Sequence, residues 1–260
     1  MEKELWNFTE DIKDKSAIFK FYHLNSKHTI RTQCFNAPKL DYEIIQEEEE
    51  YPIITQIPFL CDIKDDGFTL YNALMERKTS WDFKKETLND LEIEKFLAYS
   101  FGNKSQENQL KTYPSGGRLY PIEIYLIPSV KIIGSNKVFK EDNIVRYNVN
   151  TRNIEFIKKG NANQIDKLIS ATDIGRFSFS QSQFLICLVG NYKMMSKKYH
   201  SLTYRLMQNE AGHIGQNIML TAAALGLNSV PLGGFFEDRI NSLIGIKETN
   251  KQTLYVFAIG

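Results

Sequence analysis

Two apolar runs and two helical patterns stand out along the chain. Residues 121–127 (PIEIYLI) and 184–190 (FLICLVG) are apolar at nearly every position. Strands with both faces covered have this pattern, so we expect both runs to lie inside a sheet. Apolar residues at helical spacing predict a helix over 88–100 and a longer one over 202–225, which should end near Gly226.

The remaining patterns complete an α+β architecture. Two short apolar segments at 144–148 and 153–157, joined by a polar connection, predict a hairpin, and 254–259 predicts a final strand. Thr87 with Asp90 resembles a capping box at the start of the first helix. Because strands and helices alternate irregularly, we expect a central, mostly antiparallel or mixed sheet flanked by helices.

The first 66 residues differ in character from the rest of the chain. Short amphipathic pieces, including 17–22, are mixed there with the acidic run Glu47–Glu50, which suits a solvated linker or turn. We therefore expect an N-terminal extension over 1–66 and a folded domain over 67–260.

Composition and charge exclude several classes of protein. Lys and Arg total 32 and Asp and Glu total 31, so the net charge of +1 provides no global field for nucleic acid or an anionic membrane. Neither the three cysteines nor the four histidines have the spacing of a metal site, and Cys187 suits a small core residue. The chain lacks a signal-like or membrane-spanning apolar segment, which predicts a cytoplasmic protein.

Three separated segments carry polar chemistry that suits a flat, phosphorylated ligand. Residues 77–80 (RKTS) combine two cations and two hydroxyls, which suit a phosphate, although on its own this segment fits a solvated basic turn better. Paired glycines at 116–117 and 233–234 permit positive φ and close approach of backbone to a ring. Each pair alone also fits an ordinary tight turn.

Taken together, the segments resemble the nitroreductase-fold flavoproteins, and in detail the SagB/McbC-type azoline dehydrogenases. Residues 114–125 (PSGGRLYPIEIY) are similar to the P-S-G-G-x-x-Y-P-x-E-x-Y signature of that branch. Tyr204-Arg205, followed by 210–217 (EAGHIGQN), and the early 22–27 (YHLNSK) match it as well. One departure is Trp81, which stands where relatives usually carry a second arginine.

This resemblance implies an FMN-dependent oxidoreductase that converts thiazoline or oxazoline rings to thiazole or oxazole in a ribosomally synthesised peptide. It implies a homodimer with FMN at the subunit interface, along the helical segment 204–226. The partners it implies are an azoline-containing precursor peptide and a cyclodehydratase complex, which the extension 1–66 would help to contact. It implies these cofactor residues: Arg77, Lys78 and Thr79 at the phosphate and ribityl chain; Ser115, Gly116 and Gly117 along the ring; Pro231, Leu232, Gly233 and Gly234 near N5; and Arg205 as a further cation or a structural ion pair.

The same resemblance assigns catalysis to Lys198 and Tyr199. Aromatisation removes a proton and a hydride from neighbouring ring carbons, so the protein needs a base for the proton. Which of the two residues is the base stays open. Neighbouring strand residues point to opposite faces, so we expect the pair in a turn or at a helix start. Without the resemblance, 197–198 would be explained as a basic surface turn.

Two other functions remain open at this point. One is a general NAD(P)H-dependent nitro- or quinone reductase of the same fold. The other is a non-catalytic scaffold of the modification complex, which would be colourless because it would bind no flavin.

Overall fold

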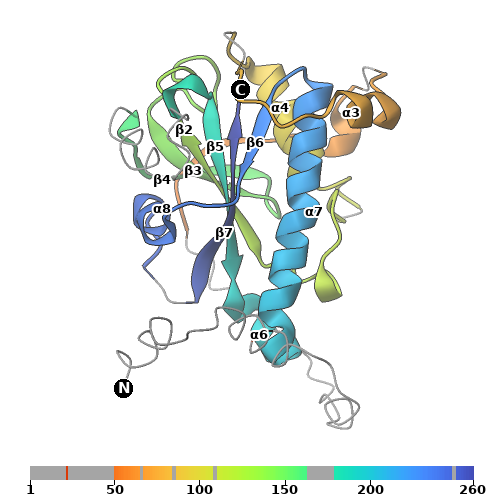
Figure 1. Cartoon of the computed structure of the whole chain (residues 1–260), viewed down its shortest axis with the longest axis vertical. Helices are drawn as coiled ribbons and strands as arrows, with labels where there is room; N and C mark the ends of the chain where they lie inside the picture. Colours follow the sequence, from red (N-terminus) through yellow and green to blue (C-terminus); the bar gives the residue numbers. More distant parts are fainter. Residues whose placement is uncertain are drawn as a thin grey trace, which may run out of the picture.

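The structure is a computed structural model that describes Tyr22 and residues 50–64, 67–83, 86–107, 110–162, 179–247 and 250–260. The amphipathic segment 17–22 and the 22–27 motif, apart from Tyr22, lie outside the described residues, as do 47–49 of the acidic run. Figure 1 shows one sheet with the long helix α7 (Thr203–Ala224) along one side of it.

Within the described residues, seven strands form one sheet in the order β1-β4-β3-β2-β5-β7-β6, and all neighbouring pairs are antiparallel. The two apolar runs are β2 and β5, which pair with each other in the interior of the sheet. The hairpin (β3 and β4) and the final strand (β7) are confirmed as well. The bounds are β1 Ile53–Gln56, β2 Ile122–Pro128, β3 Asn143–Asn148, β4 Asn153–Lys159, β5 Phe184–Asn191, β6 Ser229–Leu232 and β7 Lys251–Ile259.

Helices cover the sheet, as the sequence pattern predicts, although several of them carry no strong sequence signal. The two predicted helices are α4 and α7, whereas α3, α6 and α8 are short and have no separate prediction. The bounds are α3 Leu70–Glu76, α4 Asp90–Phe101, α6 Tyr192–Tyr199, α7 Thr203–Ala224 and α8 Glu237–Leu243, with single 3-10 turns η2 Leu60–Asp62, η3 Gly116–Arg118, η4 Phe179–Gln181 and η5 His200–Leu202.

The capping box of α4 differs from the prediction. The Asn89 carboxamide accepts from the Glu92 N–H at 3.1 Å, and the Glu92 carboxylate accepts from the Asn89 N–H at 2.9 Å. The box expected from Thr87 and Asp90 is therefore wrong by two residues. The Leu88 N–H is bound to the Gln183 side chain at 2.9 Å, which holds residue 88 outside the helix.

The end of α7 agrees with the sequence. Gly226 has a positive φ of 62°. Its N–H donates to the Ala223 carbonyl at 2.9 Å, and the Leu227 N–H donates to the Ala222 carbonyl at 2.8 Å. These two bonds form a Schellman motif, which needs a left-handed residue and therefore favours glycine.

The sheet separates two apolar layers because alternate strand residues point to opposite faces. Ile124 and Leu126 of β2 join α4 and α7 in the larger cluster. Tyr125 and Ile127 join residues of α8 in the smaller one, and Figure 1 shows α8 across the sheet from α7. Cys187 is fully buried in the smaller layer, which confirms its role as a core residue.

Strand β1 lies inside the segment 1–66, which the sequence pattern predicts to be an extension. It pairs with β4, with Ile53 opposite Glu155, and forms one edge of the sheet. At least these four residues are thus part of the same sheet as the strands of the predicted domain. No helix in the described part of the chain is both long and apolar enough to cross a membrane.

Candidate functional site

The loop that precedes β2 has an unusual backbone. Gly117, Arg118 and Tyr120 have positive φ values of 62°, 60° and 48°. Residues other than glycine rarely adopt this conformation, and each one destabilises a fold by about 1–3 kcal/mol unless its surroundings hold it. Strain of this kind clusters at ligand and active sites, so this loop is the first candidate.

The Lys198 and Tyr199 side chains converge on this loop. A Cβ atom built on Gly117 would lie 2.6 Å from Lys198 Nζ and 2.8 Å from Tyr199 Oη. Lys198 Nζ lies 5.4 Å from the centre of the Tyr199 ring. The catalytic pair and the P-S-G-G loop, which are predicted from separate motifs, therefore lie close together.

The pair does not lie in a turn or at a helix start, so that expectation is wrong. It occupies the end of α6, and His200 follows with a positive φ of 44°. Two consecutive residues on a helix reach one point here because both side chains are long. The loop also lies close to both helices elsewhere, since a Cβ on Gly116 would lie 3.2 Å from Met195 Cε of α6 and 3.6 Å from Leu206 Cδ1 of α7.

A group of buried and partly buried polar residues contacts the loop from the side of α7. We call it the Glu210 cluster, and its members are Lys111, Tyr113, Ser115, Tyr120 and Glu210. The Ser115 hydroxyl lies 2.5 Å from Glu210 Oε2 and accepts from the Tyr120 N–H at 2.9 Å. Lys111 Nζ lies 4.1 Å from the centre of the Tyr120 ring.

Burial controls the charges of this cluster. It raises the pKa of Glu210 to about 7, although the Ser115 hydrogen bond and Lys111 act in the opposite direction. It lowers the pKa of Lys111 to about 8, which Glu210 partly offsets. Sequence reasoning did not assign either residue to the site. The available signal was a glutamate on the apolar face of the long helix, next to Ala211 and one turn before Ile214.

The segment 77–80 and the start of β6 lie beside each other, at the end of α7 away from α6. Arg77 caps the end of α3, and Thr79 forms a parallel bridge with Ser229, the first residue of β6. The Asn228 carboxamide donates to the Asp82 carbonyl. Trp81, the departure from the family pattern, packs against the smaller apolar layer.

The residues after Ser229 divide between core and surface. Pro231 and Leu232 belong to β6, where they pair with Phe257 and Val256, and the Leu232 side chain is buried. Gly233 and Gly234 follow the strand and are exposed. A Cβ on either glycine would meet no atom within 4 Å, so there is open space beside this backbone.

The predicted residues thus form two groups. Figure 1 shows α3 beside one end of α7 and α6 beside the other. Residues 77–79 and Ser229 lie at the α3 end, whereas the P-S-G-G loop and the Lys198–Tyr199 pair lie at the α6 end. From Ser229, opposite Ile259, strand β6 runs to Leu232, opposite Val256, so Gly233 and Gly234 lie between the two ends. Arg205 is in the first turn of α7 and therefore belongs to the second group, away from Thr79.

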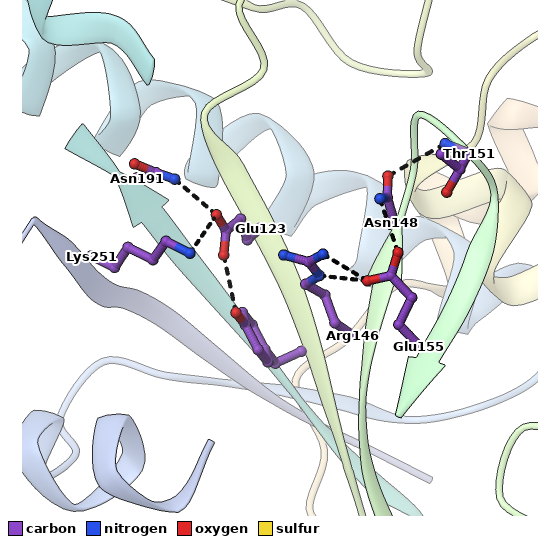
Figure 2. Close-up of polar contacts among 8 residues, drawn as sticks. Glu123, Arg146, Asn148, Thr151, Glu155, Asn191 and Lys251 are labelled. Atoms are coloured by element: carbon purple, nitrogen blue, oxygen red, sulfur yellow. Dashed lines mark hydrogen bonds and ion pairs between the residues drawn. The ribbon is translucent and has the colours of Figure 1, made fainter. Parts of the chain in front are cut away.

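The second half of the 114–125 signature has a different environment. Its glutamate and final tyrosine, Glu123 and Tyr125, belong to what we call the Glu123 network, drawn in Figure 2. Glu123 accepts from the Tyr125 hydroxyl at 3.0 Å and from the Asn191 carboxamide at 2.9 Å, and Lys251 Nζ lies 3.2 Å away. The other members are Arg146, Asn148 and Glu155.

Arg146 and Glu155 form the charged pair of this network, on the neighbouring strands β3 and β4. Arg146 Nε donates to Glu155 at 2.8 Å, and a second guanidinium nitrogen lies 2.7 Å from the same oxygen. The Asn148 carboxamide donates to the other oxygen at 3.0 Å. The described contacts therefore provide partners for all four carboxylate oxygens of Glu123 and Glu155.

Two further features lie outside both groups. An open hollow is lined by residues from three loops, namely Phe59, Cys61, Asp62, Ser105, Gln106, Glu107 and Arg152. It shares no residue with the site described above. Among the described residues, no three His, Cys, Asp or Glu side chains are grouped so that they could hold a metal ion.

The chain belongs to the nitroreductase family, whose model matches residues 74–260. Proteins of this family are oxidoreductases that typically bind flavin. The fold, a sheet with helices on both faces, is that of the solved relatives. The structure from Ralstonia eutropha described as a nitroreductase covers 82% of this chain and 98% of its own, with 17% identity and a TM-score of 0.62.

Two curated proteins are similar in sequence. "Putative nitroreductase MJ1384" of Methanocaldococcus jannaschii is 25% identical over 193 residues, which are 74% of this chain and 90% of that protein. "Microcin B17-processing protein McbC" of Escherichia coli is 23% identical over 177 residues, 68% of this chain and 63% of McbC. The E. coli microcin synthetase McbBCD complex with truncated pro-MccB17 contains a chain with TM-score 0.63 and 21% identity, covering 94% of this chain and 91% of that one.

Proposed function

We propose that this protein is an FMN-dependent dehydrogenase that oxidises thiazoline or oxazoline rings to thiazole or oxazole in a ribosomally synthesised peptide. The observation that carries the proposal is the convergence of Lys198 Nζ and Tyr199 Oη on Gly117 of the P-S-G-G loop. A proton acceptor beside a ring-binding loop is what this reaction needs. The likeness to McbC supports the choice of substrate class.

The reaction divides between cofactor and protein. FMN, when bound, supplies the acceptor for the hydride. Lys198 and Tyr199 take the proton from the neighbouring ring carbon. Two C–H bonds therefore break, one releasing a hydride and the other a proton, and a double bond forms between the two ring carbons. The proton acceptor has to be a neutral amine or a phenolate, and a proton shared between the two side chains would provide either.

The predicted cofactor residues fit a flavin in chemical terms. Arg77, Lys78 and Thr79 offer two cations and a hydroxyl to a phosphate. The open space beside Gly233 and Gly234 admits a ring close to the backbone. On the other side, Ser115 and the paired glycines of the loop offer a hydroxyl and a flat surface.

Because the segment 77–79 and the P-S-G-G loop lie at opposite ends of α7, we assign each flavin site to two chains. In a two-fold homodimer, the α3 end of one chain would face the loop of its partner. The surface of α3 supports this arrangement, since Leu70, Tyr71 and Met75 are each about two-thirds exposed and Leu74 is 54% exposed. Such an apolar surface is unusual on a monomer.

Complementation between two inactive variants tests the shared site. The first variant combines Lys198→Ala with Tyr199→Phe, and the second is Arg77→Glu. In a mixed dimer with shared sites, one of the two sites receives only intact residues. Because random exchange in an equal mixture makes half of the dimers mixed, about a quarter of the wild-type activity of the mixture returns. Two separate sites, each inside one chain, would give no recovery. Native mass spectrometry distinguishes the mixed dimers from the single species by mass.

The reaction itself is tested by mass spectrometry of an azoline-bearing peptide after incubation with the yellow, flavin-loaded protein. Each oxidised ring should lose the mass of two hydrogen atoms. Intact peptide after full incubation with the flavin-loaded protein would overturn the azoline assignment. A colourless protein that takes up no flavin would favour the scaffold instead.

A second candidate is a general NAD(P)H-dependent nitroreductase. The match to the family model and to MJ1384 favours it. Rapid reduction of a nitroaromatic compound with NADH, without azoline oxidation, would make it the better assignment. Substitution of Lys198 and Tyr199 separates the two candidates further, since hydride transfer from NADH to flavin requires no base.

A further inference from the structure

The Ser115 hydroxyl lies between a backbone donor and a carboxyl group. It accepts from the Tyr120 N–H at 2.9 Å, and its oxygen lies 2.5 Å from Glu210 Oε2. A hydroxyl has one proton and two acceptor positions, and the Tyr120 N–H fills one of the latter. The state of Glu210 therefore decides where the Ser115 proton points.

Two arrangements satisfy this geometry. When Glu210 is ionised, it can only accept, so the Ser115 proton is committed to Oε2. When Glu210 carries a proton on Oε2, that proton fills the second acceptor position of Ser115. The Ser115 proton is then free to donate to another acceptor beside the loop.

The surroundings of Glu210 allow both states near neutral pH. The residue is 2% exposed, and its second oxygen, Oε1, is buried without a hydrogen-bond partner in the described structure. A buried ionised carboxylate with one unpaired oxygen is destabilising. The same burial raises the pKa of Glu210 to about 7.

Other charged or titratable groups near Glu210 come from three elements. The loop contributes Lys111 and Tyr113, of which only Lys111 favours the ionised form of Glu210. Helix α6 contributes Lys198 and Tyr199 across Gly117. Arg205 and His213 lie within five residues of Glu210 on α7 itself. The strands β2 and β5 under the helix present apolar side chains, namely Ile122, Ile124, Ile186 and Leu188.

We propose that Glu210 is a positioning residue whose protonation turns the Ser115 hydroxyl from the helix toward an acceptor atom of a ring bound at the Gly116–Gly117 loop. The inference rests on the proposed function insofar as that ring is a flavin. Glu210 itself does not touch the ring and acts through Ser115. Protonation of Glu210 should therefore strengthen flavin binding by one hydrogen bond.

The first test needs no flavin. Infrared spectra of protein labelled with ¹³C at glutamate carboxyl groups are compared between wild type and Glu210→Gln from pH 5 to pH 9. We expect a protonated carboxyl band that disappears as the pH rises through about 7 and that the variant lacks. A Glu210 carboxyl already ionised at pH 5 would overturn the inference and leave the proposed function untouched.

The second test measures the Kd of FMN at pH 6 and pH 8.5 by quenching of flavin fluorescence. Loss of one hydrogen bond should weaken wild-type binding about fivefold at the higher pH. Glu210→Met offers the Ser115 proton at most a weak thioether acceptor and should therefore lack this fivefold weakening at the higher pH. Ser115→Ala should show the weaker FMN binding at both pH values.

Glu210→Gln is the matched control for every other titrating group, including the FMN phosphate. For this variant, the ratio of the FMN Kd at pH 8.5 to the Kd at pH 6 should be about fivefold smaller than the same ratio for wild type. An equal ratio in wild type and Glu210→Gln would overturn the inference. Absence of FMN binding in all variants would overturn both the proposed function and the assignment of the ring, while the infrared result would still decide the state of Glu210.

Discussion

The Glu123 network and the Glu210 cluster each contain residues of the 114–125 signature and lie on opposite sides of the sheet. They differ in how completely their polar atoms are paired and in the strain of the backbone beside them. In the Glu123 network, the described contacts pair both carboxylates at both oxygens with amide, phenol or cationic donors. In the Glu210 cluster, one carboxylate oxygen and the Tyr113 hydroxyl are buried and have no hydrogen-bond partner among the described residues. The backbone beside the cluster is strained at Arg118 and Tyr120.

This difference indicates how polar groups that stabilise the fold can be distinguished from polar groups that bind a ligand. A network whose carboxylates are paired at every oxygen fixes the pairing of strands, although the Asn191 Oδ1 atom at its edge has no hydrogen-bond partner among the described residues. An unsaturated cluster beside a strained loop is less stable than it could be, and such strain persists where function needs it. By this criterion we expect the P-S-G-G half of the signature to bind a ligand and the E-x-Y half to stabilise the sheet.

The largest effect should come from the pair above the loop. Lys198→Ala combined with Tyr199→Phe removes both proton acceptors and should reduce azoline oxidation about 10²–10⁴-fold. Bound flavin and the urea midpoint should change little, because Lys198 is exposed and phenylalanine keeps the ring that Tyr199 packs against the larger apolar layer. Turnover is measured by mass spectrometry and flavin by its absorbance. Wild-type turnover in this variant would return the pair to the status of a basic surface turn.

For the Glu123 network we expect the second largest effect, which is a loss of stability with little change in flavin binding. Glu155→Ala leaves Arg146 buried without its carboxylate partner, which should lower the free energy of unfolding by about 3–5 kcal/mol. Flavin affinity of the folded protein should stay within a factor of about two. Urea denaturation gives the first quantity and flavin titration the second. Arg146→Met with Glu155→Leu is the control, because it removes both charges and should recover much of the loss.

A smaller effect concerns stability against pH. Burial raises the pKa of Glu210 from its ordinary 4.5 to about 7, so between these values the folded state holds a proton that the unfolded state has released. Stability should therefore fall as the pH rises through this window, by on the order of 2 kcal/mol. Glu210→Gln should lack this decline. Urea midpoints at pH 5 and pH 7.5 provide the comparison, and parallel declines in both proteins would contradict it.

The smallest effect concerns the contact between loop and pair. Gly117→Ala places a Cβ against Lys198 Nζ and Tyr199 Oη and should reduce turnover about tenfold by displacing them. Gly134→Ala is the matched control, because Gly134 also has positive φ, 84°, but has no atom within 4 Å of a new Cβ. Both substitutions should destabilise the fold by a similar amount, about 1 kcal/mol. Equal turnover in the two variants would mean that the contact does not matter.

Much of the fold could be predicted from the sequence, because local patterns reflect local constraints. Continuous apolar runs mark β2 and β5, which are covered on both faces, and Gly226 marks the end of α7. Strand β6 could not be predicted, since its four residues gain their structure from pairing with β7. The local pattern places the capping box of α4 two residues early, because a tertiary bond from Gln183 to Leu88 decides where the helix begins.

The candidate site follows the same division. The sequence by itself determined which residue types recur in which order, since the chemistry of a phosphate and a flat ring calls for cations, hydroxyls and glycines. It left Glu210 and Lys111 out of the site, because the sequence does not say how deeply a charge is buried. Only the tertiary structure decided that Lys198 and Tyr199 meet Gly117 and that Arg77 lies at the other end of α7. The physical reason is that contacts between distant segments depend on how the sheet and helices pack, and no local pattern encodes that packing.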